Sequence, residues 1–185
     1  DWYNQEEFNP ALKEVWMLLA KSEFHKADFL GSIGTFTYIS KHYATDSELN
    51  TACKIWMIRA YAEMDWIYEA EQLLMSLEVS GLKGDNLGLY LSTQADLLIK
   101  KKQYNDAIPF LEKALLKEKD SFLKNRFKFV LAQLYKQTGD KAQSYNLFTE
   151  VIKSNPPYIR EFNARLQRAE LYQTSIKSIR REILK

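Results

Sequence analysis

The chain has 185 residues, of which 46% are hydrophobic and 27% are charged, a composition typical of a folded protein. Its 26 basic and 24 acidic residues leave a net charge of +2, which gives no global argument for binding nucleic acid or an anionic membrane. The single cysteine, Cys53, excludes an internal disulfide, and two histidines separated by 17 positions offer no metal cluster. We therefore expect no cofactor and no nucleic-acid partner.

No segment predicts a membrane span or a secretion signal. The longest uninterrupted apolar run, residues 15–20, is far shorter than the ~20 residues that a spanning helix needs. Residues 1–7 lack the basic start and the small-residue cleavage site of a signal peptide. We expect either a cytoplasmic protein or an interior piece of a longer one, with no membrane insertion by this segment.

Apolar residues recur at helical spacing along nearly the whole chain, and no segment of any length alternates with period two. Asn9 and Pro10 predict the first N-terminal cap, whereas residues 84–86 are expected to form a loop. The chain should therefore contain helices and no sheet. The expected helices span about residues 10–25, 28–42, 47–64, 67–79, 87–101, 104–118, 121–138 and 141–153, with a last one from 158 toward the C-terminus that breaks near 174–175.

The second helix of each successive pair carries a small residue at the same position, which we name the anchor. The anchors are Ser32, Ala70, Ala107 and Ser144, which are 38, 37 and 37 residues apart. Four and seven positions after each anchor stand further apolar residues, at Phe36 and Ile39, Leu74 and Leu77, Leu111 and Ala114, and Phe148 and Val151. Four units therefore share one packing pattern.

The first helix of each pair follows the same register. Twelve residues before the anchors stand Ala20, Ile58, Ala95 and Ala132, and nine before them Glu23, Tyr61, Leu98 and Tyr135. Small residues opposite large ones are what ridge-into-groove packing requires, and stacked helix pairs build a curved solenoid. If Tyr135 is buried between helices, its replacement by alanine should destabilise the protein by ~3–5 kcal/mol.

The fourth unit carries residues that resemble the signature of the tetratricopeptide repeat (TPR), namely Leu131, Ala132, Tyr135, Gly139, Phe148 and Pro156. The first unit matches the same positions at Trp16, Leu19, Ala20, Phe29 and Phe36, and the third at Ala95, Tyr104, Ala107 and Ala114. The resemblance implies an all-α, TPR-like right-handed α-α superhelix of about four helix pairs plus a C-terminal helix. We expect one domain over residues 1–185, with repeats at about 11–45, 47–82, 85–119 and 121–157 and a capping helix at 158–185. The spacing of 37 to 38 residues, where the common repeat has 34, and the serine anchors depart from the family pattern.

A narrower resemblance concerns the SprE/PorW lipoproteins of Bacteroidetes. It rests on residues 61–71, 131–139, 155–158 and 161–165, which look like the repeat region of those proteins. The resemblance implies a periplasmic, outer-membrane-anchored protein of gliding motility and type IX secretion, of which this chain would be an interior piece. Cys53 lies in the middle of an expected helix and cannot be the lipidated cysteine of such a protein.

No catalytic constellation is present, since the chain has no Gly-rich phosphate loop, no Gly-x-Ser-x-Gly elbow and no His-Glu-x-x-His. The glycines of residues 31–34 fall inside an expected helix, where they favour close packing over ligand binding. His25 and His42 lie near helix ends, where capping or surface roles are expected. Cys53 is expected to be a small buried hydrophobe. We therefore predict a protein that is not an enzyme.

The concave surface of such a solenoid is lined by the first helix of each pair. Positions fifteen, eleven and eight before the anchors should point toward it, which predicts a mixed apolar and basic groove for a protein or peptide segment. A plain solvated face is the alternative for each of these residues. The predicted partner-binding residues are Met17, Lys21, Phe24, Ile55, Arg59, Asp96, Phe129, Gln133 and Lys136.

The basic excess of residues 160–185 favours a polar outer face of a capping helix over an anionic-surface site. The SprE/PorW resemblance implies a protein-interaction scaffold on the periplasmic face of the outer membrane, in contact with secretion machinery components. The alternative is a cytoplasmic, signal-sensing TPR domain of a larger regulator, and a third possibility is an accessory domain of an enzyme.

Overall fold

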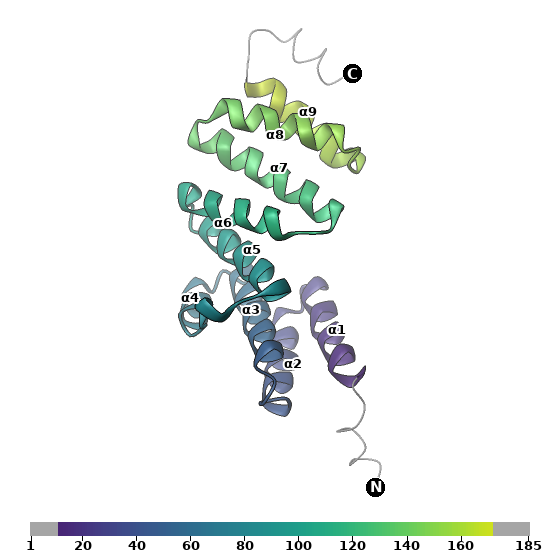
Figure 1. The fold of residues 1–185 in the computed structure, drawn as a ribbon, viewed down its shortest axis with the longest axis vertical. Helices are drawn as coiled ribbons and strands as arrows, with labels where there is room; N and C mark the ends of the chain where they lie inside the picture. The colour runs from purple at the N-terminus through teal and green to yellow at the C-terminus, as the bar shows by residue number, and fades with distance from the viewer. Residues whose placement is uncertain (1–10, 172–185) are drawn as a thin grey trace. The chain divides into compact units, whose positions relative to one another are not determined.

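The computed structural model describes residues 11–171, and these residues form helices joined by short turns, with no strand among them (Figure 1). The predicted all-α class is therefore confirmed. The α-helices are α1 Ala11–His25, α2 Phe29–His42, α3 Ser47–Glu63, α4 Ile67–Met75, α5 Gly84–Lys100, α6 Tyr104–Lys117, α7 Ser121–Thr138, α8 Lys141–Lys153 and α9 Tyr158–Leu171, and the 3-10 helix η2 spans Val79–Gly81.

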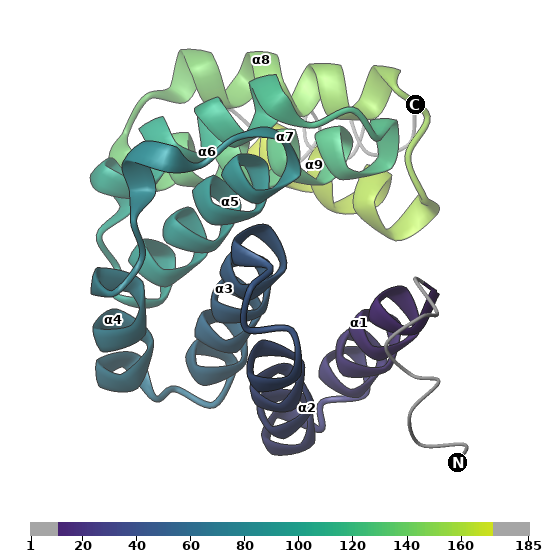
Figure 2. The same ribbon diagram turned by 60° about the horizontal axis from the view of Figure 1, so that its bottom comes forward.

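The helices group into two compact units, Asp1–Thr93 and Gln94–Lys185, with the boundary inside α5. In the first unit α1 packs on α2 and α2 on α3 (Figure 2), and in the second unit α6, α7, α8 and α9 pack in chain order. The single domain predicted over the whole sequence stays a prediction. The Asn9–Pro10 cap, the break near residues 174–175 and most of the basic C-terminal excess lie outside the described residues.

Two predicted boundaries are wrong. Helix α4 ends at Met75, four residues early, because the Ser76 hydroxyl donates to the carbonyl of Leu73 (2.7 Å) and the last turn tightens into i to i−3 bonds. Residues 84–86, predicted as a loop, are the first turn of α5. Gly84 has a φ of +53°, which lets the chain turn sharply into this helix, and the Asn86 amide donates to the carbonyl of Glu48 (2.9 Å).

One turn geometry recurs inside all four helix pairs. The residue five positions before each anchor has a positive φ: Ala27, Asp65, Lys102 and Gly139. The next residue is the N-cap of the second helix, and in the first and fourth pairs an aspartate, Asp28 or Asp140, accepts a backbone N–H at 3.0 Å. Only the fourth pair has glycine at the left-handed position, so the sequence signal for this turn was strongest there.

The anchors are completely buried, as are the residues twelve positions before them. In the first and fourth pairs a hydrogen bond joins these positions: the Ser32 hydroxyl donates to the carbonyl of Ala20 (2.9 Å) and the Ser144 hydroxyl to that of Ala132 (2.7 Å). Serine therefore replaces alanine here at no steric cost, and its hydroxyl is satisfied by the facing helix. This bond explains why two anchors depart from the residue that the family prefers.

The core of the first unit forms between α2 and α3, where Phe36 stacks on Trp56 with ring centroids 6.1 Å apart. Cys53 is buried in this cluster, and burial raises the pKa of its thiol to about 11, which keeps the sulfur protonated at neutral pH. Its predicted role as a small buried hydrophobe is confirmed. The glycines of residues 31–34 lie within α2, also as predicted.

The core of the second unit forms where α7, α8 and α9 meet, around Phe148 and Val151. Asn125 is a buried polar residue that sequence reasoning missed. Its amide donates to the carbonyl of Val151 (3.2 Å), and its Oδ1 accepts from the Arg160 guanidinium (2.9 Å). One side chain therefore ties three helices together, and the described part of α9 covers α8 as the predicted capping helix should.

We expect Ser144→Ala to cost at most ~1 kcal/mol, because only one neutral hydrogen bond is lost and two other anchors are already alanine. Ser144→Leu should cost ~3 kcal/mol or more, because a larger side chain has no room between α7 and α8. Urea denaturation of both variants measures the difference. Equal destabilisation by the two substitutions would contradict close helix approach at the anchor.

Tyr135 is only half-buried, so the assumption that its ring is enclosed between helices is wrong. Its hydroxyl instead donates to Glu112 (2.6 Å), and burial together with this carboxylate raises the pKa of Tyr135 to about 12. We now expect Tyr135→Ala to cost ~1–2 kcal/mol, against ~3–5 kcal/mol for Phe148→Ala, whose ring has no exposed surface. Similar shifts in the urea midpoint for both variants would refute this ranking.

Candidate functional site

The structure divides the predicted partner-binding residues of the first unit into two groups. Met17, Lys21 and Arg59 keep part of their surface exposed. Phe24 and Ile55 are buried instead: Phe24 packs edge-on against Trp56 with ring centroids 5.2 Å apart, and Ile55 has no exposed surface. A partner cannot reach these two side chains, because the chain turns them into the core.

Two cations cover the aromatic surface between α1 and α3. The Arg59 guanidinium lies 4.5 Å from the centroid of the Trp56 ring and 5.5 Å from that of Phe24. The Lys21 ammonium lies 5.6 Å from the Trp56 ring. Cation–π contacts of this kind hold long side chains in place while leaving their charge near solvent.

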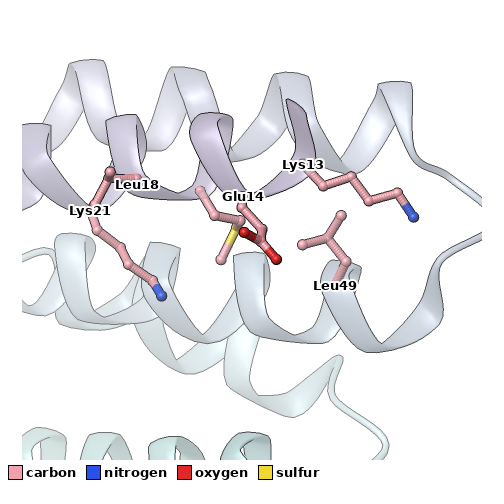
Figure 3. A pocket seen from close by; sticks show the side chains of 6 residues that line it. Lys13, Glu14, Leu18, Lys21 and Leu49 are labelled. Carbon is pink, nitrogen blue, oxygen red and sulfur yellow. The ribbon is translucent and has the colours of Figure 1, made fainter. Parts of the chain in front are cut away.

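An open hollow of about 410 Å³ lies beside these cations, between α1 and the start of α3 (Figure 3). It brings together Met17 and Lys21, which the sequence predicted, with four residues that it did not. The hollow is lined by Lys13, Glu14, Met17, Leu18, Lys21 and Leu49. The spacing of residues 14, 17, 18 and 21 places them on one face of a helix, and that pattern was the signal available in the sequence. Leu49 comes from another helix, so only the fold brings it to the site.

The rim of the hollow is held by an ion pair and a helix cap. The Lys13 ammonium donates to Asp46 at 2.8 Å, and the other carboxylate oxygen of Asp46 accepts the backbone N–H of Leu49 at 3.0 Å. The bond from Lys13, followed by that from Leu49, lowers the pKa of Asp46. Asp46 thus fixes the first turn of α3, from which Leu49 projects toward α1.

The predicted partner-binding residues of the second unit differ in their contacts and exposure. The Phe129 ring packs edge-on against Phe148 with centroids 5.7 Å apart, and so belongs to the core rather than to an open surface. The Lys136 ammonium pairs with Glu170 of α9 at 2.5 Å. Gln133 is exposed and Asp96 half-buried, so both remain accessible.

The chemistry of these surfaces is that of binding. Within residues 11–171, no group of three or more His, Cys, Asp or Glu side chains is arranged to hold a metal ion. The helices of this part of the chain are also too short or too polar to cross a membrane. What the hollow offers is an apolar floor with charged groups at its edge, which suits an apolar side chain on a protein segment.

We expect Asp46→Ala to destabilise the protein by ~1–2 kcal/mol at pH 7, because it removes both a helix cap and an ion pair. Since the folded-state pKa lies below the ordinary value of 3.8, this contribution is fully present above about pH 4 and is lost as the pH falls through the lowered pKa. Urea denaturation from pH 7 downward measures it. Asp28→Ala, which removes a similar cap from α2, is the control. A destabilisation that grows in acid would show that the carboxylate is not the stabilising form.

The family model described as Tetratricopeptide repeat matches residues 90–116 and 126–158. These segments correspond to the third and fourth predicted repeats, 85–119 and 121–157, except that the second match extends one residue further, so both predicted repeats match the tetratricopeptide repeat model. A search of curated proteins finds no significant sequence match.

Solved structures show the same fold over almost the whole chain. One of them contains the nearly identical TPR-like repeats of a Podosopora anserina protein described as a kinesin light chain. It has a TM-score of 0.68 and 15% identity, and the match covers 96% of this chain and 95% of that chain. The MamA protein has a TM-score of 0.63 at 13% identity, covering 95% of this chain and 92% of its own. A MamA RS-1 double mutant has a TM-score of 0.65 at 12% identity, covering 93% and 90%. At these identities the likeness shows the fold alone, which is the predicted all-α, TPR-like class.

Proposed function

We propose that this protein is a non-catalytic interaction scaffold that binds a protein or peptide segment across α1 and α3. The observation that carries the proposal is the hollow between these helices, whose apolar floor is formed by Met17, Leu18 and Leu49. TPR folds present the first helix of each pair on their concave side, and α1 and α3 are the first helices of their pairs.

The electrostatics of the hollow favour a segment with an apolar side chain between polar neighbours. Lys13 is neutralised by Asp46, while Glu14 and Lys21 stand on the α1 side of the hollow with opposite charges. A charged partner residue is attracted by one of these two side chains and repelled by the other. The rim therefore discriminates between partner segments by the positions of their charges more than by their net charge.

The finer part of the proposal concerns the setting. We place the protein in a type IX secretion or gliding apparatus, on the periplasmic face of the outer membrane, with components of that machinery as its partners. The support is the sequence resemblance of residues 61–71, 131–139, 155–158 and 161–165 to the SprE/PorW lipoproteins. Helix α3 supplies the first residues of this likeness and also Leu49, one of the three residues of the apolar floor.

Site-specific photo-crosslinking in cells of the source organism tests both parts. A photoreactive residue at position 21 or 49 should form a defined protein adduct, whereas one at Tyr68 of α4, which is exposed and outside the hollow, should not. Met17→Glu should abolish the adducts, because a carboxylate on the apolar floor opposes entry of an apolar side chain.

The identity and location of the adducts separate the outcomes. Adducts at all three positions alike, or at none, would contradict the binding surface. Adducts with periplasmic or outer-membrane secretion components support the setting. Cytoplasmic partners, or a kinase or DNA-binding module in the same polypeptide, would contradict the setting and favour the signal-sensing alternative.

A further inference from the structure

One end of the second unit carries two large apolar side chains that face solvent. Leu116 lies in the last turn of α6 and is 83% exposed, and Phe122 lies in the first turn of α7 and is 51% exposed. The two residues flank the short connection between these helices. Large apolar side chains that stay exposed at neighbouring positions are a feature of surfaces that contact a partner or a lipid.

The repeat register shows that these two positions are not packing positions of the array. At the position of Leu116 the first and fourth pairs have a lysine, and at the position of Phe122 the second and third pairs have an acidic residue. A charged residue is rarely placed where another helix must cover it, and all four of these equivalents are exposed. They are Lys41, Lys153, Glu48 and Asp85.

The connection between α8 and α9 lies at the same end of the second unit (Figure 1). The buried Asn125 amide near the start of α7 donates to the carbonyl of Val151 near the end of α8 (3.2 Å). Its Oδ1 accepts from the Arg160 guanidinium of α9 (2.9 Å), which lies 4.5 Å from the centroid of the Phe122 ring. Arg160 is therefore held beside the exposed ring by a neutral amide and an aromatic face.

Further cations lie around the two apolar side chains. Arg126 stands one turn after Phe122 on the same side of α7, and burial followed by the positive charge of Arg126 lowers the pKa of Arg160. Within residues 11–171, neither guanidinium pairs with a carboxylate. We use the name basic edge for Leu116 and Phe122 together with the five cations near them, Lys117, Lys119, Lys124, Arg126 and Arg160.

The two acidic residues of the α6–α7 connection are turned to the backbone. The Glu118 carboxylate accepts the N–H groups of residues 119 and 120 (2.7 and 2.9 Å), and the Asp120 carboxylate accepts the N–H of Leu123 (2.8 Å) as the cap of α7. They offset part of the positive charge but pair with none of the cations. The basic edge therefore keeps an excess of positive charge around its apolar side chains.

We propose that the basic edge docks on a bilayer surface that contains anionic phospholipids. Leu116 and Phe122 enter the headgroup region, and the cations contact lipid phosphates. The cations are spread over the ends of α6, α7 and α9, and a flat bilayer can meet all three ends at once, whereas one extended protein segment would follow a single line. The docking is peripheral, since none of the described helices is long and apolar enough to cross a membrane.

Co-sedimentation of the purified chain with large unilamellar vesicles tests the proposal. The chain should sediment with phosphatidylcholine vesicles that contain ~30% phosphatidylglycerol and not with vesicles of pure phosphatidylcholine, because only the former have a negative surface potential. Raising the salt concentration from ~0.1 M to ~0.5 M should weaken the binding, because exposed charges are then screened over a shorter distance.

Two matched pairs of variants assign the binding to the basic edge. Leu116→Gln should weaken binding about tenfold, because an apolar side chain is lost from the lipid contact. Leu30→Gln, which changes an exposed leucine of the first unit, should leave binding unchanged.

The second pair compares two exposed lysines of the second unit. Lys119→Gln should weaken binding about fivefold, whereas Lys141→Gln, at the start of α8 and so at the opposite end, should change it less than about twofold. Both variants have the same net charge, so the difference between them measures position alone. Circular dichroism of all four variants should match the unchanged chain, because each altered side chain is exposed.

The outcomes separate a lipid surface from other partners. Lack of sedimentation with the anionic vesicles, or equal sedimentation with the neutral ones, overturns the inference. Equal loss in Lys119→Gln and Lys141→Gln would show a response to net charge only, and also overturns it. Binding of a fluorescent polyglutamate peptide without binding of vesicles would assign the basic edge to an acidic protein segment instead. The hollow lies in the first unit, so each of these results leaves the proposed function standing.

Discussion

The close approach of two helices at each anchor is the contact on which the rest of the structure depends. Ser32, Ala70, Ala107 and Ser144 have no exposed surface, and Ser32 and Ser144 contact the residue twelve positions earlier, Ala20 and Ala132. A side chain larger than alanine or serine would push the helices apart and open the aromatic contacts beside them. Where the anchor is serine, its hydroxyl also finds a carbonyl on the partner helix, so a polar atom is buried without penalty.

The close packing of the two helices in each pair determines the conformation of the turn between them. The left-handed residue always stands five positions before the anchor, although three of the four residues there have a Cβ and adopt this conformation at some cost. The left-handed conformation of the turn residue therefore results from helix packing and not from the preference of the residue at that position. A turn that is set by tertiary contacts explains how the pairs keep one shape while their turn residues differ.

The candidate binding surface follows from the same packing. Because the anchor side of α1 packs against α2, the face of α1 that carries Met17, Leu18 and Lys21 is left to line the hollow beside α3. The ion pair of Lys13 with Asp46 links α1 to the first turn of α3, so the apolar floor and its charged edge are held by the same contact. Binding side chains sit on rigid helices here, which limits the ordering cost of recognition.

The sequence by itself determined the helical class, the anchors and most helix boundaries, because these depend on spacing along one helix and on local caps. It placed α7 and α8 residue for residue. It could not decide which residues of a helix face solvent when two apolar neighbours compete for the core: Phe24 and Ile55 were predicted to meet a partner and are buried, while Leu18 is exposed. It also missed Asn125 and Leu49, whose partners lie on other helices. The periodicity of apolar residues shows which face of each helix is apolar. Which residues of that face are buried depends on the neighbouring helix, and only the tertiary structure shows which helix that is.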